Sequence, residues 1–260
     1  MSRSVMMSEL SWDDYRRRLA DEDAIVLVPV GAIEQHGYHL PLGTDWLIAT
    51  YMARRAAEAV GGIVASPITY GSRSQIRTGG GPHQCGTTSL DSQTFIVLVK
   101  DVLKELARHG ARKIAVIDAH FENRFLLDES CFQATRELQY LNIDDVKIFK
   151  MQYAEALSQE TREKAYEGLV FPGRDFEHGG IFETAIMLYA HPDLVDLSKV
   201  PDEDLPKFPP YDVFPVNPDW VPKSGNLSSG KHATEKRGEL MVEEIVDVIV
   251  KSLQTEFRQD

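Results

Sequence analysis

The chain has 260 residues, a formal net charge of −12 and a globular composition, with 43% hydrophobic and 26% charged residues. This acidic balance without a Lys/Arg cluster argues against nucleic acid and anionic membranes as partners, and two cysteines, Cys85 and Cys131, exclude a disulfide framework. We expect a single cytoplasmic domain over residues 1–260, because no apolar run reaches the ~20 residues of a membrane span and the N-terminus lacks an apolar signal segment.

Short apolar runs alternate with longer amphipathic stretches along the chain, which predicts an α/β fold. Strands are predicted over 24–30, 63–66, 113–118 and 146–151. Helices are predicted over 11–20, 45–60, 91–109, 123–140, 153–165, 181–190 and 233–257. The alternation implies a parallel sheet with helices on both faces and a site at the carboxyl ends of the strands. The Pro-, Asp- and Ser-rich segment 193–230 is predicted to be an ordered excursion or an oligomer contact.

Potential metal ligands follow two of these strands. Glu34 and His36 come after the first strand, and His120 and Glu122 come after the third. Residues two apart on extended backbone point to the same side, so each strand end presents a carboxylate and an imidazole. Asp45, at the start of a helix, adds a carboxylate that could bridge two ions. Imidazole and carboxylate without thiolate favour two divalent metal ions, Zn²⁺ or Mn²⁺. Alternatively, Glu34 and Asp45 are helix caps and the histidines line a loop.

Two further segments are candidates for the walls of this site. The long loop 70–90 contains three consecutive glycines, but lacks the Gly-Lys-Ser/Thr of a phosphate loop. His83 in this loop either faces the site or is structural. The glycine-rich stretch 177–180 precedes a helix and presents His178 as a catalytic acid/base or, alternatively, as a helix cap. Glu183, one turn into that helix, is predicted to support the site without binding metal.

These residues resemble the motifs of the creatininase (creatinine amidohydrolase) family. The signature P-x-G-[SA]-x-E-Q-H-G-x-H stands at 29–39, a G-H-x-x-N-like motif at 119–123 and E-H-[AG]-G-x-x-E-T at 177–184. The resemblance covers essentially the whole chain, and it implies a three-layer α/β/α sandwich assembled as a homohexamer.

The resemblance also implies roles for individual residues. One metal ion would be held by Glu34, Asp45 and His120, and the other by His36, Asp45 and Glu122, with Asp45 bridging. His178 would be the acid/base, with Glu177 beside it to orient the imidazole, and Glu122 would serve the reaction as well as the metals.

The sequence departs from creatinine-hydrolysing members of that family around the substrate pocket. Ala154 and Arg174 stand where those members have two tryptophans, Phe121 replaces a tyrosine, and Thr78 replaces a serine. The resemblance implies a metal-dependent amidohydrolase of small cyclic amides. Because the planar fork of Arg suits carboxylate or phosphate, we expect its substrate to be anionic and other than creatinine. Alternatively, Arg174 lies on the surface and touches nothing.

Three other functions stay open. Creatinine itself could be the substrate. The same metal-generated hydroxide would also attack a lactone or a formamide. The chain could also bind metal without catalysis.

Overall fold

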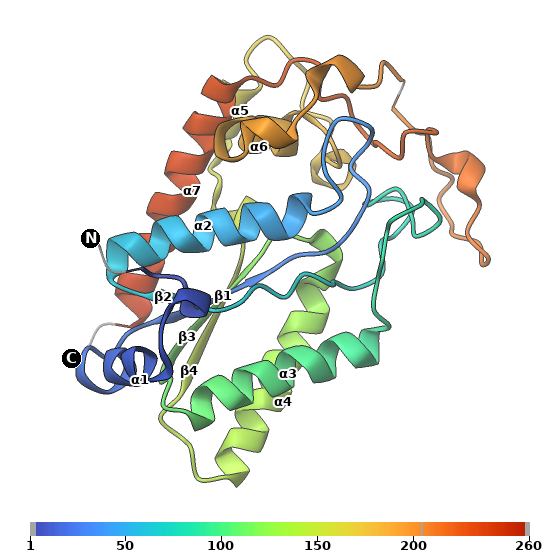
Figure 1. Ribbon diagram of the computed structural model, residues 1–260. Coiled ribbons are helices and arrows are strands. Elements are labelled where there is room, and N and C mark those ends of the chain that lie inside the picture. Colours follow the sequence, from blue (N-terminus) through green and yellow to red (C-terminus); the bar gives the residue numbers. More distant parts are fainter. Residues whose placement is uncertain (1–3, 204, 258–260) are drawn as a thin grey trace.

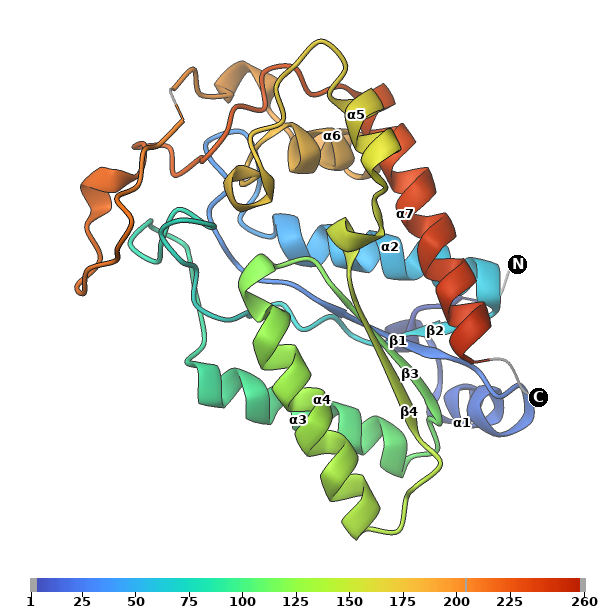
Figure 2. The ribbon, with the colours of Figure 1, turned by 180° about the vertical axis from the view of Figure 1, so that it is seen from behind.

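The computed structural model describes residues 4–203 and 205–257, which form three layers (Figures 1 and 2). The central layer contains β1 (Val26–Val30), β2 (Ile63–Val64), β3 (Lys113–Asp118) and β4 (Lys147–Gln152). The strands lie in the order β2-β1-β3-β4, and each neighbouring pair is parallel. The predicted α/β class with a parallel central sheet is confirmed, and the predicted strands differ only at their ends.

Helices cover both faces of this sheet. The first layer contains α2 (Thr44–Val60), α5 (Gln159–Ala165), α6 (Ile181–Ala190) and α7 (Glu235–Glu256), and the second contains α1 (Trp12–Asp21), α3 (Ser92–Arg108) and α4 (Arg124–Tyr140). In β3, Ala115 and Ile117 pack into the first core, whereas Ile114 and Val116 pack into the second. Successive side chains of a strand point to opposite faces, so a strand that is apolar at every position needs cover on both.

The strand order places the carboxyl ends of β1 and β3 side by side. The connection from β1 to β2 runs through α2 on one face, and the connection from β2 to β3 runs through α3 on the other. Open α/β sheets bind ligands where the direction of winding reverses in this way. The loops that carry the candidate metal ligands start at these two strand ends.

Two predictions of local structure need correction. The helix predicted over 153–165 is divided into a 3₁₀ turn, Tyr153–Ala156, and α5. The hydroxyl of Ser158 accepts a hydrogen bond from the Thr161 amide at 3.1 Å, so an N-cap interrupts the run. Asp45 is not a helix cap, because Gly43 occupies that position and Asp45 lies inside the first turn of α2.

The segment 193–230, orange in Figures 1 and 2, lies beside the loop 70–90 at the strand-end side of the molecule. Arg77 joins the two, with Nε 2.7 Å from Asp212 Oδ1 and Nη2 2.7 Å from the Tyr211 carbonyl oxygen. Near the end of the segment, residues 224–228 are buried. The described part of the segment is thus an ordered excursion, and its role as an oligomer contact stays a prediction.

Two features of the described residues are relevant to the cellular compartment of the protein. None of their helices is long and apolar enough to cross a membrane. Cys85 and Cys131 are both free thiols. The cytoplasmic location stays a prediction.

Candidate active site and metal centre

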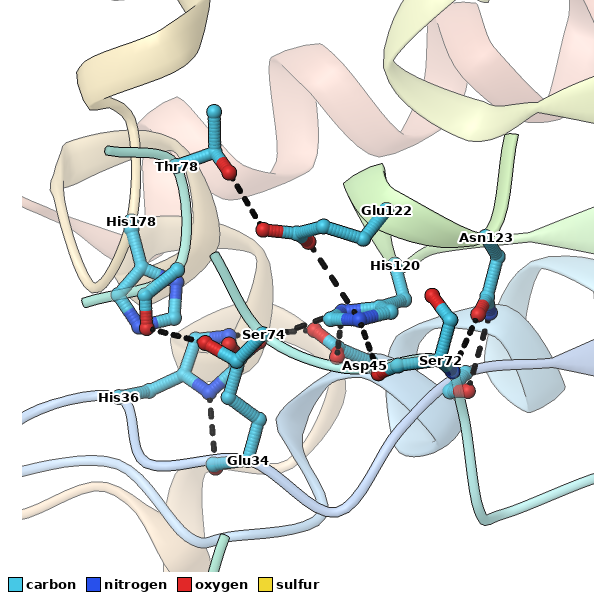
Figure 3. A network of polar contacts seen from close by, with 12 residues as sticks. Glu34, His36, Asp45, Ser72, Ser74, Thr78, His120, Glu122, Asn123 and His178 are labelled. Carbon is cyan, nitrogen blue, oxygen red and sulfur yellow. Dashed lines mark hydrogen bonds and ion pairs between the residues drawn. The ribbon is translucent and has the colours of Figure 1, made fainter. Parts of the chain in front are cut away.

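The loops after β1 and β3 and the start of α2 bring the predicted ligands into one buried cluster (Figure 3). Glu34, His36, Asp45 and His120 are each no more than 2% exposed. His120 Nδ1 lies 3.2 Å from Glu34 Oε2 and 3.0 Å from Asp45 Oδ2. His36 Nε2 lies 3.1 Å from Asp45 Oδ1. Asp45 therefore presents one oxygen to each imidazole, as a bridging carboxylate would.

Two more carboxylates reach this cluster. Glu122 Oε2 lies 3.4 Å from His120 Nε2, and Glu183 Oε1 lies 3.5 Å from His36 Nε2. Ligand atoms within 4.8 Å of one another group Glu122 with Glu34 and His120, and Glu183 with His36 and Asp45. The sequence pattern assigned Glu183 a supporting role, and the family resemblance implied that Glu122 shares an ion with His36. One feature of the sequence could have indicated that Glu183 reaches the cluster: it belongs to the same motif as His178 and lies one turn into the helix that follows.

The loop 70–90 holds Glu122 in place. Glu122 Oε1 accepts hydrogen bonds from the Gln75 amide at 3.0 Å and from the Thr78 hydroxyl. The same loop passes against Glu34, since a Cβ on Gly79 would lie 2.2 Å from Glu34 Oε1, and only glycine allows this approach. His83 is exposed and is not among the residues that line the pocket, which favours its structural role.

Backbone carbonyl groups determine which nitrogen of each imidazole faces the cluster. His36 Nδ1 donates to the Glu34 carbonyl oxygen at 3.1 Å, and His120 Nε2 donates to the Ser72 carbonyl oxygen at 3.2 Å. The tautomers inferred from this network leave lone pairs on His36 Nε2 and His120 Nδ1, both directed at Asp45. Histidine ligands in metal sites are oriented by such hydrogen bonds from the other ring nitrogen.

The chemistry of the cluster fits cations. Among the described residues, Glu34 Oε1, His36 Nε2 and Asp45 Oδ2 are buried polar atoms without a hydrogen-bond partner, which is costly unless another group binds them. Burial alone would lower the pKa of His36, but the charges of Glu183 and Asp45 raise it well above its ordinary value. Divalent ions would displace such protons and bind the atoms that lack a hydrogen-bond partner. The cluster therefore fits a pair of divalent ions.

His178 is buried beside this cluster, and its Nε2 lies 2.7 Å from the Gln35 carbonyl oxygen. The side-chain nitrogen of Gln35, Nε2, also lies 2.9 Å from His178 Nε2, but it donates its hydrogens to the carbonyl oxygens of Gly79 and Gly225. Because those two bonds use both amide hydrogens, His178 Nε2 carries the ring proton and Nδ1 has the lone pair. Burial, followed by the charge of His36, holds the pKa of His178 well below its ordinary value. The neutral imidazole can therefore accept a proton at neutral pH.

The end of the segment 193–230 supports the backbone around His178. The Leu227 amide donates to the His178 carbonyl oxygen at 3.1 Å, and Asn226 Nδ2 donates to the Gly179 carbonyl oxygen at 2.9 Å. The sequence assigned no role to Asn226 or Leu227, because they lie in a stretch without periodicity. Their contribution depends on a contact between segments that are distant along the chain.

Glu177 does not hold the His178 ring in this structure. Its carboxylate accepts hydrogen bonds from the Tyr166 hydroxyl, from the Phe182 amide at 3.3 Å and from Ser228 Oγ at 3.4 Å. The group that orients the imidazole is the carbonyl of Gln35. Burial, with a further contribution from the negative charge of Glu183, raises the pKa of Glu177 to about 8.

This raised pKa predicts how stability changes with pH. The protonated form of Glu177 stabilises the fold below the ordinary carboxyl pKa, and this contribution is lost as the pH rises through about 8. Glu177→Gln cannot ionise. The melting temperatures of the variant and the wild type should therefore nearly coincide at pH 5, and the variant should melt higher by about 5–15 °C at pH 9. Thermal unfolding at both pH values measures this, and equal melting temperatures at pH 9 would contradict it.

One cavity of about 210 Å³ collects the candidate side chains. The residues on its walls include Glu34, His36, Asp45, Thr78, His120, Phe121, Glu122, Ala154, Arg174, Glu177, His178 and Glu183. Ala154 lies in the 3₁₀ turn after β4, and Arg174 begins the 3₁₀ turn Arg174–Phe176. Arg174 is exposed and is among the residues that line the pocket, and its contact with a substrate stays a prediction.

Comparisons with known proteins agree with this site. The family model of creatinine amidohydrolase matches residues 8–253. A creatinine amidohydrolase of Pseudomonas putida is 43% identical over 257 residues, which is 99% of each chain. A solved creatininase in an Mn form is 43% identical with a TM-score of 0.95, and a creatininase variant of Zn–Zn type is 42% identical with a TM-score of 0.95. In both structural comparisons 99% of this chain and 100% of the other are covered.

The fold and the site together define a metal-dependent amidohydrolase of the α/β class, a hydrolase of non-peptide carbon–nitrogen bonds. The chain belongs to the creatininase family, since the family model spans almost all of it and the Pseudomonas putida relative matches it from end to end. The resemblance noted in the sequence motifs and the three-layer fold that it implied are both confirmed.

Proposed function

We propose that the chain hydrolyses a carbon–nitrogen amide bond in a small, cyclic and anionic substrate other than creatinine, with two divalent ions, Zn²⁺ or Mn²⁺. The observation that carries the proposal is the convergence of buried imidazole and carboxylate atoms, three of them without a hydrogen-bond partner, beside a neutral His178. The relatives support the chemistry, because they are described as a creatinine amidohydrolase and as Mn and Zn–Zn creatininases. Assembly as a homohexamer stays a prediction.

The distances support one ligand set for each ion. Glu34, Asp45 and His120 would hold one ion, with Glu122 beside them. His36, Asp45 and Glu183 would hold the other. We therefore assign Glu183 to the second ion in place of Glu122, and keep Asp45 as the bridge.

The metal ions and the protein side chains would have different roles in the reaction. When bound, divalent ions supply a nucleophile at neutral pH by lowering the pKa of water, and they polarise a carbonyl group. His178 Nδ1 accepts a proton and passes it to the leaving nitrogen of the amide. The Gln35 carbonyl keeps the ring oriented through His178 Nε2 during both transfers. Burial excludes bulk water from the proton that His178 carries.

The pocket wall favours a substrate other than creatinine. Ala154 leaves only a methyl group where large aromatic side chains would cover the pocket, and Arg174 contributes a positive charge. The chain as a whole is acidic, so an anionic substrate needs a local cation to attract it. Hydrolysis of creatinine is the second candidate, supported by the 43% identity to the Pseudomonas putida enzyme.

Metal analysis combined with a substrate panel tests this function. Purified protein should contain about two divalent ions per chain, and removal by a chelator should abolish amide hydrolysis. Removal should also lower the melting temperature by about 5–10 °C, because ions that bind only the native state stabilise it. Zn²⁺ or Mn²⁺ should restore both properties. Carboxylate-bearing hydantoins and lactams should be hydrolysed with higher kcat/KM than creatinine.

The outcomes separate the alternatives. Faster turnover of creatinine than of any anionic ring amide would show that the family's substrate is retained. Two bound ions without hydrolysis of any amide, lactone or formamide would identify a non-catalytic metal-binding protein. A metal-free chain that is indifferent to chelators would refute the proposed centre.

A further inference from the structure

The active-site cavity has a second cationic region that the metal chemistry does not use. Three arginines line the cavity, namely Arg124, Arg162 and Arg174. Arg124 is already paired, since its Nη2 lies 3.0 Å from Glu155 Oε1. Among the residues that the structure describes, the guanidinium groups of Arg162 and Arg174 form neither an ion pair nor a hydrogen bond. A pocket wall with two unpaired guanidinium groups is suited to an anion.

An aromatic platform positions one of these guanidinium groups. The Cζ atom of Arg162 lies over the ring of Phe171, 5.0 Å from its centroid. Phe171 in turn packs edge-on against Tyr166, with 5.1 Å between the ring centroids. Tyr166 is only 4% exposed, and its hydroxyl donates to Glu177, the neighbour of His178. The platform under Arg162 is therefore anchored in the wall that carries the catalytic histidine.

The charges around Arg162 and Arg174 limit the charge of the ligand that can bind there. Asp175 also lines the cavity, beside Arg174, and it offsets one of the two positive charges. The Arg124–Glu155 pair is neutral overall. Among Arg162, Arg174 and Asp175 one net positive charge remains, which matches a carboxylate better than a doubly charged phosphate. A carboxylate also presents two coplanar oxygens, which fit the fork of a guanidinium group.

We propose that Arg162 and Arg174 form a carboxylate-binding subsite, so that the substrate is an amide bearing a carboxylate group at a distance from its scissile bond. This inference rests on the proposed function for the identity of the reacting group, and on the cavity for the anion. Arg162 holds one face of the carboxylate from its place on Phe171. Arg174 contributes the second guanidinium group from the 3₁₀ turn that leads into the His178 loop. The subsite thereby selects among ring amides that the metal centre would treat alike.

Binding of ligands that cannot be hydrolysed tests the subsite independently of turnover. Cyclopentylacetate and its uncharged methyl ketone have the same shape, so calorimetric titration of the metal-loaded enzyme isolates the contribution of the charge. The wild type should bind the carboxylate about 10- to 100-fold more tightly than the ketone. Arg162→Gln and Arg174→Gln should each remove most of this preference, and the double variant should remove all of it. Arg54→Gln, on the exposed surface of α2, is the matched control and should retain it.

The arginine variants also separate the subsite from the metal centre. A carboxylate that binds only the metal ions would bind the double variant as tightly as the wild type, and this result would overturn the proposal. Equal affinity of the wild type for carboxylate and ketone would overturn it too. If Arg162→Gln unfolds, Arg162→Lys keeps the charge and loses the fork, and should lower the preference several-fold. Preserved preference with no amide hydrolysis would instead refute the proposed function and leave the subsite intact.

Discussion

Replacing His178 with asparagine should lower kcat for the best amide substrate by roughly 10²- to 10⁴-fold, the usual contribution of a positioned acid/base. The reason is that His178 is neutral, has its Nδ1 lone pair free and lies in the same cavity as the ligand cluster. The variant cannot accept the proton or return it to the leaving nitrogen. Steady-state kinetics under saturating Zn²⁺ or Mn²⁺ measure the loss.

Two controls show whether the loss of kcat reflects the acid/base role of His178. Metal content should remain that of the wild type, because His178 is not in either proposed ligand set. His83→Asn, in the exposed part of the loop 70–90, should retain wild-type kcat. If His178→Asn keeps more than about a tenth of the wild-type kcat, a general acid/base role for His178 is excluded.

Replacing Asp45 with asparagine should remove both ions and lower kcat/KM by roughly 10³-fold or more, since the ions supply several kcal/mol to the transition state. One Asp45 oxygen lies 3.1 Å from His36 Nε2 and the other 3.0 Å from His120 Nδ1. Burial opposes its ionisation, but His36 and His120 together hold the pKa of Asp45 below its ordinary value. The carboxylate is therefore charged throughout the working pH range. Elemental analysis after dialysis, together with kinetics, tests the prediction.

Variants of two other carboxylates, Glu183 and Glu122, show which residues hold each ion. Glu183→Gln should release the ion of the His36 set and leave the other, whereas Glu122→Gln should retain the ion of the His36 set. Reversed metal losses would restore Glu122 to the second ligand set, as the sequence motifs implied. An Asp45→Asn variant that retains two ions and wild-type activity would remove Asp45 from the bridging position.

Much of the site could be predicted from the order of the residues. The pairs Glu34–His36 and His120–Glu122 follow buried strands, and the period of extended backbone decides which side chains share a side. Asp45 follows at the start of a clearly amphipathic helix. Parallel strands end at one edge of a sheet, so ligands after separate strands had to meet there. The single domain over 1–260 remains a prediction of the same reasoning.

Other assignments required the folded chain. Glu183 contacts His36, and Gln35 orients His178, across connections that no local pattern encodes. The division of residues 153–165 at Ser158 was missed, because its serine cap lies within an otherwise continuous helical pattern. That division separates Ala154 from α5, which carries Arg162 to the pocket wall.

The amino-acid order alone specified the α/β class, the chemical types of the metal ligands and the strand ends that present them. These features arise from interactions between near neighbours, which have regular spacing. The packing of α6, the loop 70–90 and residues 224–228 around the strand ends decided which carboxylate joins each imidazole, which nitrogen of His178 is free and which arginines stay unpaired. Those features depend on distances between residues that are remote along the chain, and such distances exist only after the hydrophobic layers have packed.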